Sequence, residues 1–206
     1  SRKQKQTKKR STLRATRKPD MQKKEIISRL VKAGIDKREA SNEARVLIEE
    51  LFNVSAAGQL LKPDADFSSP ALEDALSRRE RREPLAYILG FAFFCGERYS
   101  LSSHCLIPRP ETELVVEAAT RLLPEAGRFA DIGCGSGCIS ISLLCARTDL
   151  FGCAADISPE ALEFARENAA LNLGTFSDRL VFSQCDALKG TPLPGGDFDA
   201  IISNPP

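Results

Sequence analysis

The chain has 206 residues, of which 42% are hydrophobic and 28% charged, an ordinary composition for a globular protein of one or two domains. No apolar run approaches the roughly 20 residues needed to cross a bilayer, and the basic start is not followed by the apolar stretch of a signal peptide. Nine of the 29 Lys and Arg residues fall within residues 1–19, which leaves 20 basic against 28 acidic residues in the rest. An acidic body of this kind argues against a general nucleic-acid-binding protein.

Residues 1–20 predict a basic, disordered tail because they contain almost no large apolar side chains. Three interpretations of this tail remain open. It is a solvated leader or upstream segment ahead of Met21, an arm with charge-driven, non-specific affinity for RNA, or an organelle presequence. We expect a cytoplasmic protein, or a protein of an organelle matrix if the tail is a presequence.

The seven cysteines include no C-x-x-C pair, and several fall within predicted strands and helices. This distribution indicates reduced, buried thiols in a reducing compartment. Because His104 is the only histidine, a zinc site would need cysteines at unusual spacings, and we expect no metal.

Residues 21–84 predict a small helical domain. Apolar residues recur with helical spacing over residues 26–31. Asp36 then stands in the N-cap position of a second helix, with Glu39 three residues later as in a capping box. Two further helices are expected, a short one over residues 55–61 and a long one that opens at Ser69 and Pro70 and ends before Pro84.

Residues 85–107 predict a linker built as a β-hairpin. Aromatic and aliphatic side chains cluster over residues 87–106, around Gly90 and Gly96. Pro110 follows in a position to open a helix, because proline is well tolerated in a first helical turn.

Residues 108–206 predict an α/β domain. Strands are expected over residues 128–132, 151–155, 180–183 and 198–202, and helices over residues 136–147 and 159–172. Strands and helices that alternate at this spacing are typical of a parallel, doubly wound, Rossmann-like sheet.

A glycine-rich motif, D-x-G-x-G-x-G, spans residues 131–137, between a predicted strand and a predicted helix. Glycines let the backbone turn tightly and approach a ligand closely, and the free N–H groups of the helix start face that ligand. The spacing differs from the dinucleotide fingerprint and favours a ligand without a pyrophosphate, with the acid close to a positive charge. A structural turn without a ligand is the alternative.

Acidic residues follow the next two predicted strands. Asp156 can accept both hydroxyls of a ribose, although it is also placed to act as a helix N-terminal charge. Asp186, ahead of Ala187, can accept a hydrogen bond from an adenine amino group, although a simple turn aspartate fits equally well. Together with the glycine-rich motif, Asp156 indicates a nucleoside cofactor.

The fourth predicted strand is followed by Ser203, Asn204, Pro205 and Pro206. The asparagine offers a donor and an acceptor, and the prolines expose backbone carbonyls. Such a turn can hold an –NH₂ group through two acceptors, the Asn204 side chain and a backbone carbonyl.

Asn-Pro-Pro after D-x-G-x-G-x-G resembles the amino-group methyltransferases that use S-adenosylmethionine. Within that group, R-E-P-L-A-Y-I-L-G (82–90) and L-I-P-R-P-E-T-E (106–113) resemble the release-factor glutamine N5-methyltransferases, the PrmC/HemK family. The resemblance covers about residues 21–206. It implies an incomplete Rossmann-like methyltransferase domain, preceded by a helical domain that docks the protein substrate and by a hairpin linker.

The resemblance also implies roles for single residues. The residues that would line the methionine side of S-adenosyl-L-methionine are Gly133, Cys134, Gly135, Ser136 and Gly137. Asp156 would hold the ribose, and Asp186 with Ala187 would lie near the adenine. The catalytic and substrate-binding group would be Asn204, which also borders the cofactor, with Pro205 and Pro206. The substrate would be the glutamine in the Gly-Gly-Gln motif of a peptide-chain release factor.

The sequence departs from the family pattern at Pro206, because the aromatic residue and later strands expected there are absent. We therefore expect a partial sequence that is inactive by itself. Two other functions remain open: an adenine N6-type or guanine N2-type methyltransferase acting on RNA or DNA, and a non-catalytic scaffold that binds S-adenosylmethionine. No membrane partner is expected, and nucleic acid would bind only weakly, through the tail.

Overall fold

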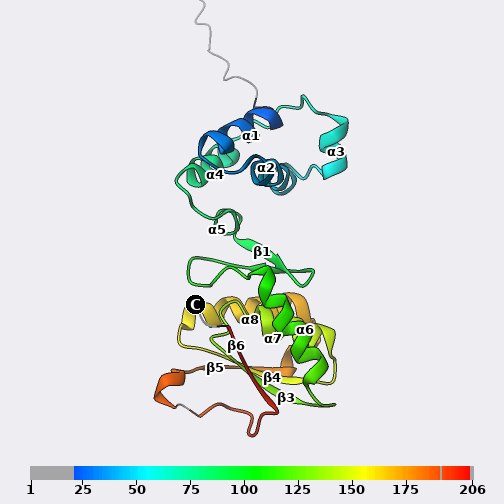
Figure 1. The fold of residues 1–206 in the computed structure, drawn as a ribbon, viewed down its shortest axis with the longest axis vertical. Coiled ribbons are helices and arrows are strands. Elements are labelled where there is room, and N and C mark those ends of the chain that lie inside the picture. The colour runs from blue at the N-terminus through cyan, green and yellow to red at the C-terminus, as the bar shows by residue number, and fades with distance from the viewer. Residues whose placement is uncertain (1–20, 191, 205–206) are drawn as a thin grey trace, which may run out of the picture. The chain divides into compact units, whose positions relative to one another are not determined.

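The computed structural model describes residues 21–190 and 192–204, which form two compact units, one ending at Glu80 and one beginning at Arg81 (Figure 1). The predicted basic tail, residues 1–20, lies outside the described residues. No helix in the described part of the chain is long and apolar enough to span a membrane.

The first unit contains the helices α1 (Lys23–Lys32), α2 (Lys37–Phe52), α3 (Ala56–Leu61) and α4 (Pro70–Glu80). The predicted caps are confirmed, since the Asp36 carboxylate accepts from the Arg38 and Glu39 amides and the Ser69 hydroxyl accepts from the Leu72 amide. The core of the unit comprises Ile26, Leu30, Leu47, Ile48, Leu72 and Leu76, all fully buried.

One detail of the helical prediction was wrong and another was confirmed. Helix α4 ends at Glu80, before Pro84 as predicted, and Arg82 adopts a left-handed φ of 70° in the turn that follows. The Glu39 carboxylate lies 3.5 Å from the Arg79 guanidinium instead of closing a local capping box.

A buried ion pair joins α2 to α4. Arg79 Nε donates to both carboxylate oxygens of Glu43 at 3.0 Å, and their side chains are only 11% and 7% exposed. A second ion pair on α2, between Arg45 and Glu49, is far more exposed, at 36% and 40%. Helix α2 therefore takes part in ion pairs of very different burial.

The second unit begins with helix α5 (Leu85–Leu89) and an antiparallel hairpin of β1 (Phe91–Phe94) and β2 (Glu97–Ser100). The predicted hairpin linker, residues 85–107, covers more of the chain than the two strands do. Residues 85–89 are helical, and Gly90, with φ 78°, ends that helix in a left-handed conformation. The extended pairing stops at Ser100 instead of reaching residue 106.

The predicted parallel α/β sheet is confirmed, with strand order β5-β4-β3-β6. Its strands are β3 (Arg128–Ile132), β4 (Phe151–Asp156), β5 (Leu180–Gln184) and β6 (Ala200–Ser203). Helices α6 (Glu113–Leu122), α7 (Cys138–Ala146) and α8 (Pro159–Leu173) pack side by side against it (Figure 1). Pro110 opens a short 3-10 turn, η1 (Pro110–Thr112), ahead of α6.

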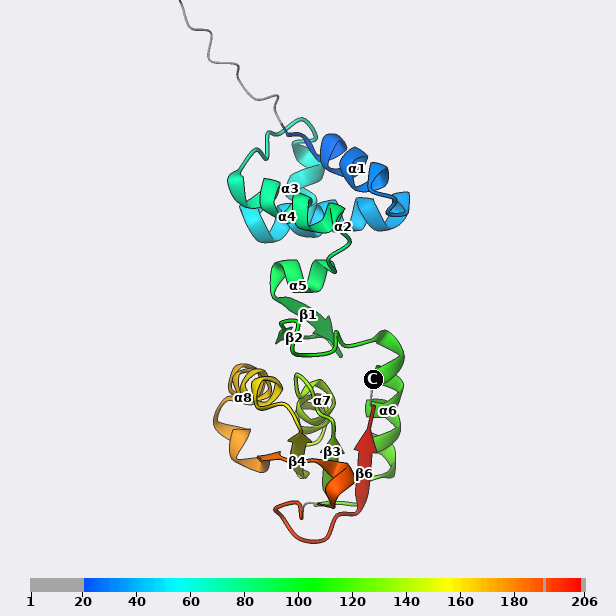
Figure 2. The same cartoon turned by 90° about the vertical axis from the view of Figure 1, so that its left-hand side faces the viewer.

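Strand β6 is the edge of the described sheet and lies beside α6 (Figure 2). Its Ile202 packs into the core, whereas Ile201 on the opposite face is 73% exposed. The alternation shows that only the face covered by helices is buried at this edge.

Polar side chains fix the hairpin to the α/β domain. The buried Asn168 of α8 accepts from the Ser100 amide at 2.7 Å and donates to the carbonyls of Ser100 and Ser136. The hydroxyls of Tyr99 and Ser142 are hydrogen bonded at 2.7 Å inside the core. The hairpin is thus attached both to the helices and to the glycine-rich loop.

The Glu43–Arg79 and Arg45–Glu49 ion pairs predict unequal costs of mutation. Glu43→Ala leaves the buried Arg79 without its main counter-ion and should lower the local stability of the first unit by about 3 kcal/mol. Glu49→Ala, the matched change on the same helix, should cost no more than about 0.5 kcal/mol. Hydrogen exchange of the α1, α2 and α4 amides measures both, because it reports on this unit separately. Equal losses in the two variants would contradict the assignment.

Candidate functional site

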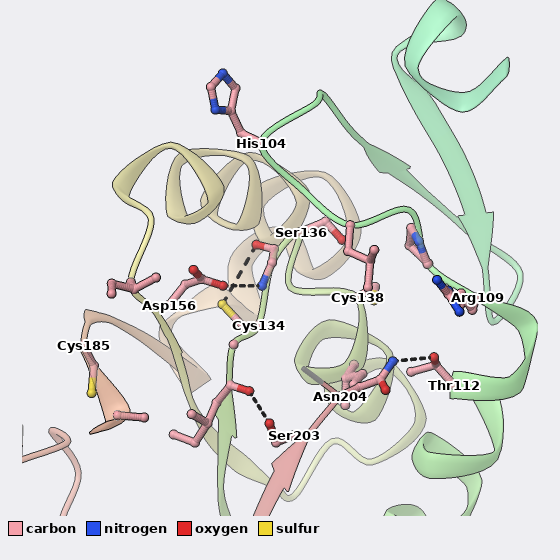
Figure 3. Close-up of a pocket in the computed structure, with 18 of the residues that line it drawn as sticks. His104, Arg109, Thr112, Cys134, Ser136, Cys138, Asp156, Cys185, Ser203 and Asn204 are labelled. Atoms are coloured by element: carbon pink, nitrogen blue, oxygen red, sulfur yellow. Dashed lines mark hydrogen bonds between the residues drawn. The ribbon is translucent and has the colours of Figure 1, made fainter. Parts of the chain in front are cut away.

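A cavity of about 550 Å³ opens at the carboxyl ends of the four parallel strands (Figure 3). Ligands of α/β sheets bind at this edge, beyond the strand ends. The predicted site residues that line it are Gly133, Cys134, Gly135, Ser136, Asp156, Asp186, Ala187 and Asn204. Two other predicted residues, Pro205 and Pro206, lie outside the described residues. The topology therefore brings four separate sequence motifs to one cavity.

The glycine-rich loop forms one wall of the cavity. Gly133 and Gly135 have positive φ values of 72° and 54°, and the space where a Cβ would stand is open at both. Gly137 is different, since it does not line the cavity and its Cβ would meet Ile141 at 3.1 Å and Ala165 at 3.2 Å. The structure therefore gives Gly137 a packing role between α7 and α8.

The Asp156 carboxylate links the first two strand ends. Its Oδ2 accepts from the Gly135 amide at 2.8 Å, and its Oδ1 accepts from the Ser158 amide at 3.0 Å. Each carboxylate oxygen can still accept another hydrogen bond. Asp156 is therefore held in a fixed orientation, with free capacity for two hydroxyl donors.

Asp186 lies at the end of β5, where its Oδ1 accepts from the Leu188 amide at 3.1 Å and its Oδ2 lies 3.0 Å from the Lys189 ammonium. Two apolar side chains that the sequence analysis missed, Ile157 and Leu188, also line this part of the cavity. They are 62% and 98% exposed. Both side chains come just after an acidic site residue in the sequence, and this position could have predicted that they line the cavity.

The carboxyl end of β6 brings Asn204 to the opposite side of the cavity. The Asn204 Nδ2 donates to the Thr112 hydroxyl at 2.8 Å, and the Ser203 hydroxyl donates to the Ile132 carbonyl at 2.7 Å (Figure 3). Thr112 and Arg109 line the cavity too, although the sequence analysis gave neither a role. Both belong to the L-I-P-R-P-E-T-E segment.

Two thiols of the cavity are poor candidates for nucleophilic chemistry. Burial raises the pKa of Cys134 well above its ordinary value and that of Cys138 to about 12. Because the thiolate is the reactive form, both groups are inert near neutral pH. Within the described residues, no group of three or more His, Cys, Asp or Glu side chains is arranged to hold a metal ion.

Asp131 lies fully buried beneath the glycine-rich loop. Its Oδ2 accepts from the Ser140 amide and hydroxyl, whereas its Oδ1 has no hydrogen-bond partner among the described residues. Burial raises the pKa of this carboxyl to about 6, although the Ser140 hydrogen bonds act in the opposite direction. A nearby cation would stabilise its ionised form.

The sheet, the glycine-rich loop and the acidic strand ends define an α/β methyltransferase domain. The methyltransferase small domain family matches residues 110–206, and the PrmC N-terminal domain family matches residues 23–90. The chain therefore belongs to the PrmC/HemK family.

Several bacterial relatives share the name release factor glutamine methyltransferase. The release factor glutamine methyltransferase of Neisseria gonorrhoeae is 39% identical over 80% of this chain and 60% of its own length. The proteins so named from Staphylococcus aureus and Caulobacter vibrioides are 42% and 38% identical, over 64% and 86% of this chain and 46% and 61% of their own lengths. The chain thus spans between 46% and 61% of the length of these relatives.

The buried Asp131 predicts a pH-dependent stability. Its pKa is raised from an ordinary 3.8 to about 6, so the native state binds this proton more tightly than the unfolded state. Its contribution should be fully present below about pH 4 and fall by about 3 kcal/mol as pH rises to about 6. Urea unfolding followed by circular dichroism from pH 4 to 7 measures it. Asp131→Asn should remove this part of the pH dependence, and an unchanged profile in that variant would contradict the prediction.

Proposed function

We propose that the protein transfers a methyl group from S-adenosyl-L-methionine to the side-chain amide nitrogen of the glutamine in the Gly-Gly-Gln motif of a peptide-chain release factor. The observation that carries the proposal is the position of Asn204 in the same cavity as the glycine-rich loop and Asp156. Membership of the PrmC/HemK family and the names of the relatives support the same reaction.

The cavity has the donors, acceptors and space that this cofactor requires. Its volume lies within the range of about 300–1,000 Å³ that is usual for small-molecule sites. Asp156 would accept the ribose hydroxyls, Gly133 and Gly135 would allow close approach of the amino-acid portion, and Ile157 with Leu188 would border the adenine. Asp131 would add negative charge beneath a cationic ligand. The bound cofactor would supply a methyl group already activated by its positive sulfur.

Asn204 would orient the glutamine amide. An amide nitrogen is a poor nucleophile because its lone pair is delocalised into the carbonyl. Acceptors on its two hydrogens can align the nitrogen with the methyl group and favour the transition state over the planar ground state. One acceptor would be Asn204 Oδ1. The second would be the Pro205 carbonyl, which lies outside the described residues. Asn204 and Pro205 would thus both bind substrate and assist the reaction.

We also propose a protein partner and a cellular location. The helical unit would dock the release factor, and the reaction would take place in the cytoplasm.

Methyl transfer from labelled S-adenosylmethionine tests the reaction, with the full-length protein and a release factor. Wild-type protein should label the release factor, and Asn204→Ala should lower the rate at least about 100-fold, as loss of a transition-state hydrogen-bond partner commonly does. A release factor with Gln→Ala in its Gly-Gly-Gln motif should remain unlabelled. Label that appears on RNA or DNA, and not on the release factor, would refute the proposal.

Cofactor affinity tests the role of Asp156 separately. Asp156→Ala should weaken binding of S-adenosylhomocysteine at least about tenfold in calorimetry, because a charged acceptor of two hydroxyls is lost. Asp197→Ala, at an exposed aspartate that does not line the cavity, is the matched control and should bind normally. Unchanged affinity in Asp156→Ala would place the ribose elsewhere.

A further inference from the structure

We propose that Thr112 is a positioning residue that holds the Asn204 side-chain amide by its NH₂ group and leaves its oxygen for the substrate. The inference rests on the proposed function, since it assigns the orientation of the group that would hold the glutamine. It gives a role to a residue that no motif of the nucleoside site includes.

The contact joins residues that are far apart in the sequence. Thr112 ends the 3-10 turn η1 and is 6% exposed, and its hydroxyl accepts a 2.8 Å hydrogen bond from Asn204 Nδ2 across 92 positions. Figure 3 shows the two side chains meeting at the wall of the cavity, with the Asn204 oxygen directed away from Thr112. The Asn204 Oδ1 is therefore the end that is left to accept a hydrogen bond from a ligand.

An asparagine amide has nearly the same shape in its two orientations but opposite polarity. A rotation of 180° about the last side-chain torsion exchanges the NH₂ group for the oxygen. With the NH₂ group toward the cavity, Asn204 would face the substrate –NH₂ as a second donor, which cannot accept its hydrogens. A hydroxyl can hydrogen bond to either end of an amide, and in this structure Thr112 holds the Nδ2 end, which leaves Oδ1 for the substrate without Thr112 touching it.

The backbone around Thr112 holds its hydroxyl in place. The Thr112 amide donates to the Arg109 carbonyl at 2.9 Å, and Pro110 restricts the first position of the turn. The next residue, Glu113, accepts from the Cys95 amide at the hairpin turn at 2.8 Å. The threonine is thus anchored on both sides, so its hydroxyl is held where it meets Asn204.

Two substitutions of Thr112 distinguish the effect of its hydroxyl from the effect of its methyl group. Thr112→Val keeps the branched shape and removes the hydroxyl, whereas Thr112→Ser keeps the hydroxyl and removes a methyl group. In the full-length protein, Thr112→Val should lower kcat for methyl transfer to the release factor about tenfold, with less change in KM. Thr112→Ser should stay within about threefold of wild type, because its hydroxyl can still accept the Asn204 hydrogen bond. Both variants should bind S-adenosylhomocysteine like the wild type.

A double-mutant cycle with Asn204→Ala distinguishes positioning from general support of the fold. If Thr112 acts through Asn204, Thr112→Val should cause little further loss once the amide is gone. Wild-type rates in Thr112→Val would overturn the proposal. Equal losses in Thr112→Val and Thr112→Ser, or full additivity with Asn204→Ala, would also overturn it, because either result describes a packing effect.

A nuclear magnetic resonance readout keeps this test independent of the reaction. The Asn204 side-chain NH₂ signals can be assigned by their loss in Asn204→Asp. Thr112→Val should shift them and speed their exchange with water, and Thr112→Ser should not. If wild type labels no glutamine but these signals respond, the proposed function fails and the positioning contact stands. If they do not respond, the contact itself is refuted.

Discussion

The Asp156 carboxylate is the interaction on which the site depends, because it fixes the loops that follow two neighbouring strands relative to each other. One oxygen accepts from Gly135 in the glycine-rich loop, and the other accepts from Ser158 at the start of α8. A glycine-rich loop without such an acceptor would be free to sample many conformations. The carboxylate that we propose to hold the ribose is therefore also the group that shapes the loop beside it, so a substitution there should change the local fold as well as ligand binding.

A second polar side chain, Asn168, links the hairpin to the glycine-rich loop. Asn168 satisfies both backbone groups of Ser100 and one carbonyl of the glycine-rich loop while fully buried. Its oxygen and NH₂ group are used by three different backbone partners, so a hydrophobic residue of similar size would leave them unpaired. Together with Glu113 at the hairpin turn, it connects the hairpin to the cavity walls.

The elements with strong local signals were predictable from the sequence. The parallel strands, the helices α7 and α8, and the caps Asp36 and Ser69 follow from periodicity and from side chains that bond their own backbone neighbourhood. Residues 85–89 were less predictable, because apolar and aromatic residues fit a strand or a short helix, and the left-handed Gly90 decides between them.

The candidate site was predictable where a motif and its function share one short segment, as in residues 133–136. Thr112 was not predictable in its role, since its partner Asn204 lies on another element and only the folded chain brings the two together. Gly137 shows that a residue can match a motif without lining the cavity. It belongs to the motif by spacing, yet its surroundings are α7 and α8 and not the cavity.

The central claim is that the Asn204 side-chain oxygen receives a substrate amide beside the cofactor. The most direct test is a crystal structure of the full-length protein with S-adenosylhomocysteine and a peptide that contains Gly-Gly-Gln. The account predicts the glutamine Nε2 within about 3.2 Å of Asn204 Oδ1, with Asn204 Nδ2 still on Thr112. A glutamine bound away from Asn204, or an Asn204 amide turned with its NH₂ group toward the peptide, would contradict it.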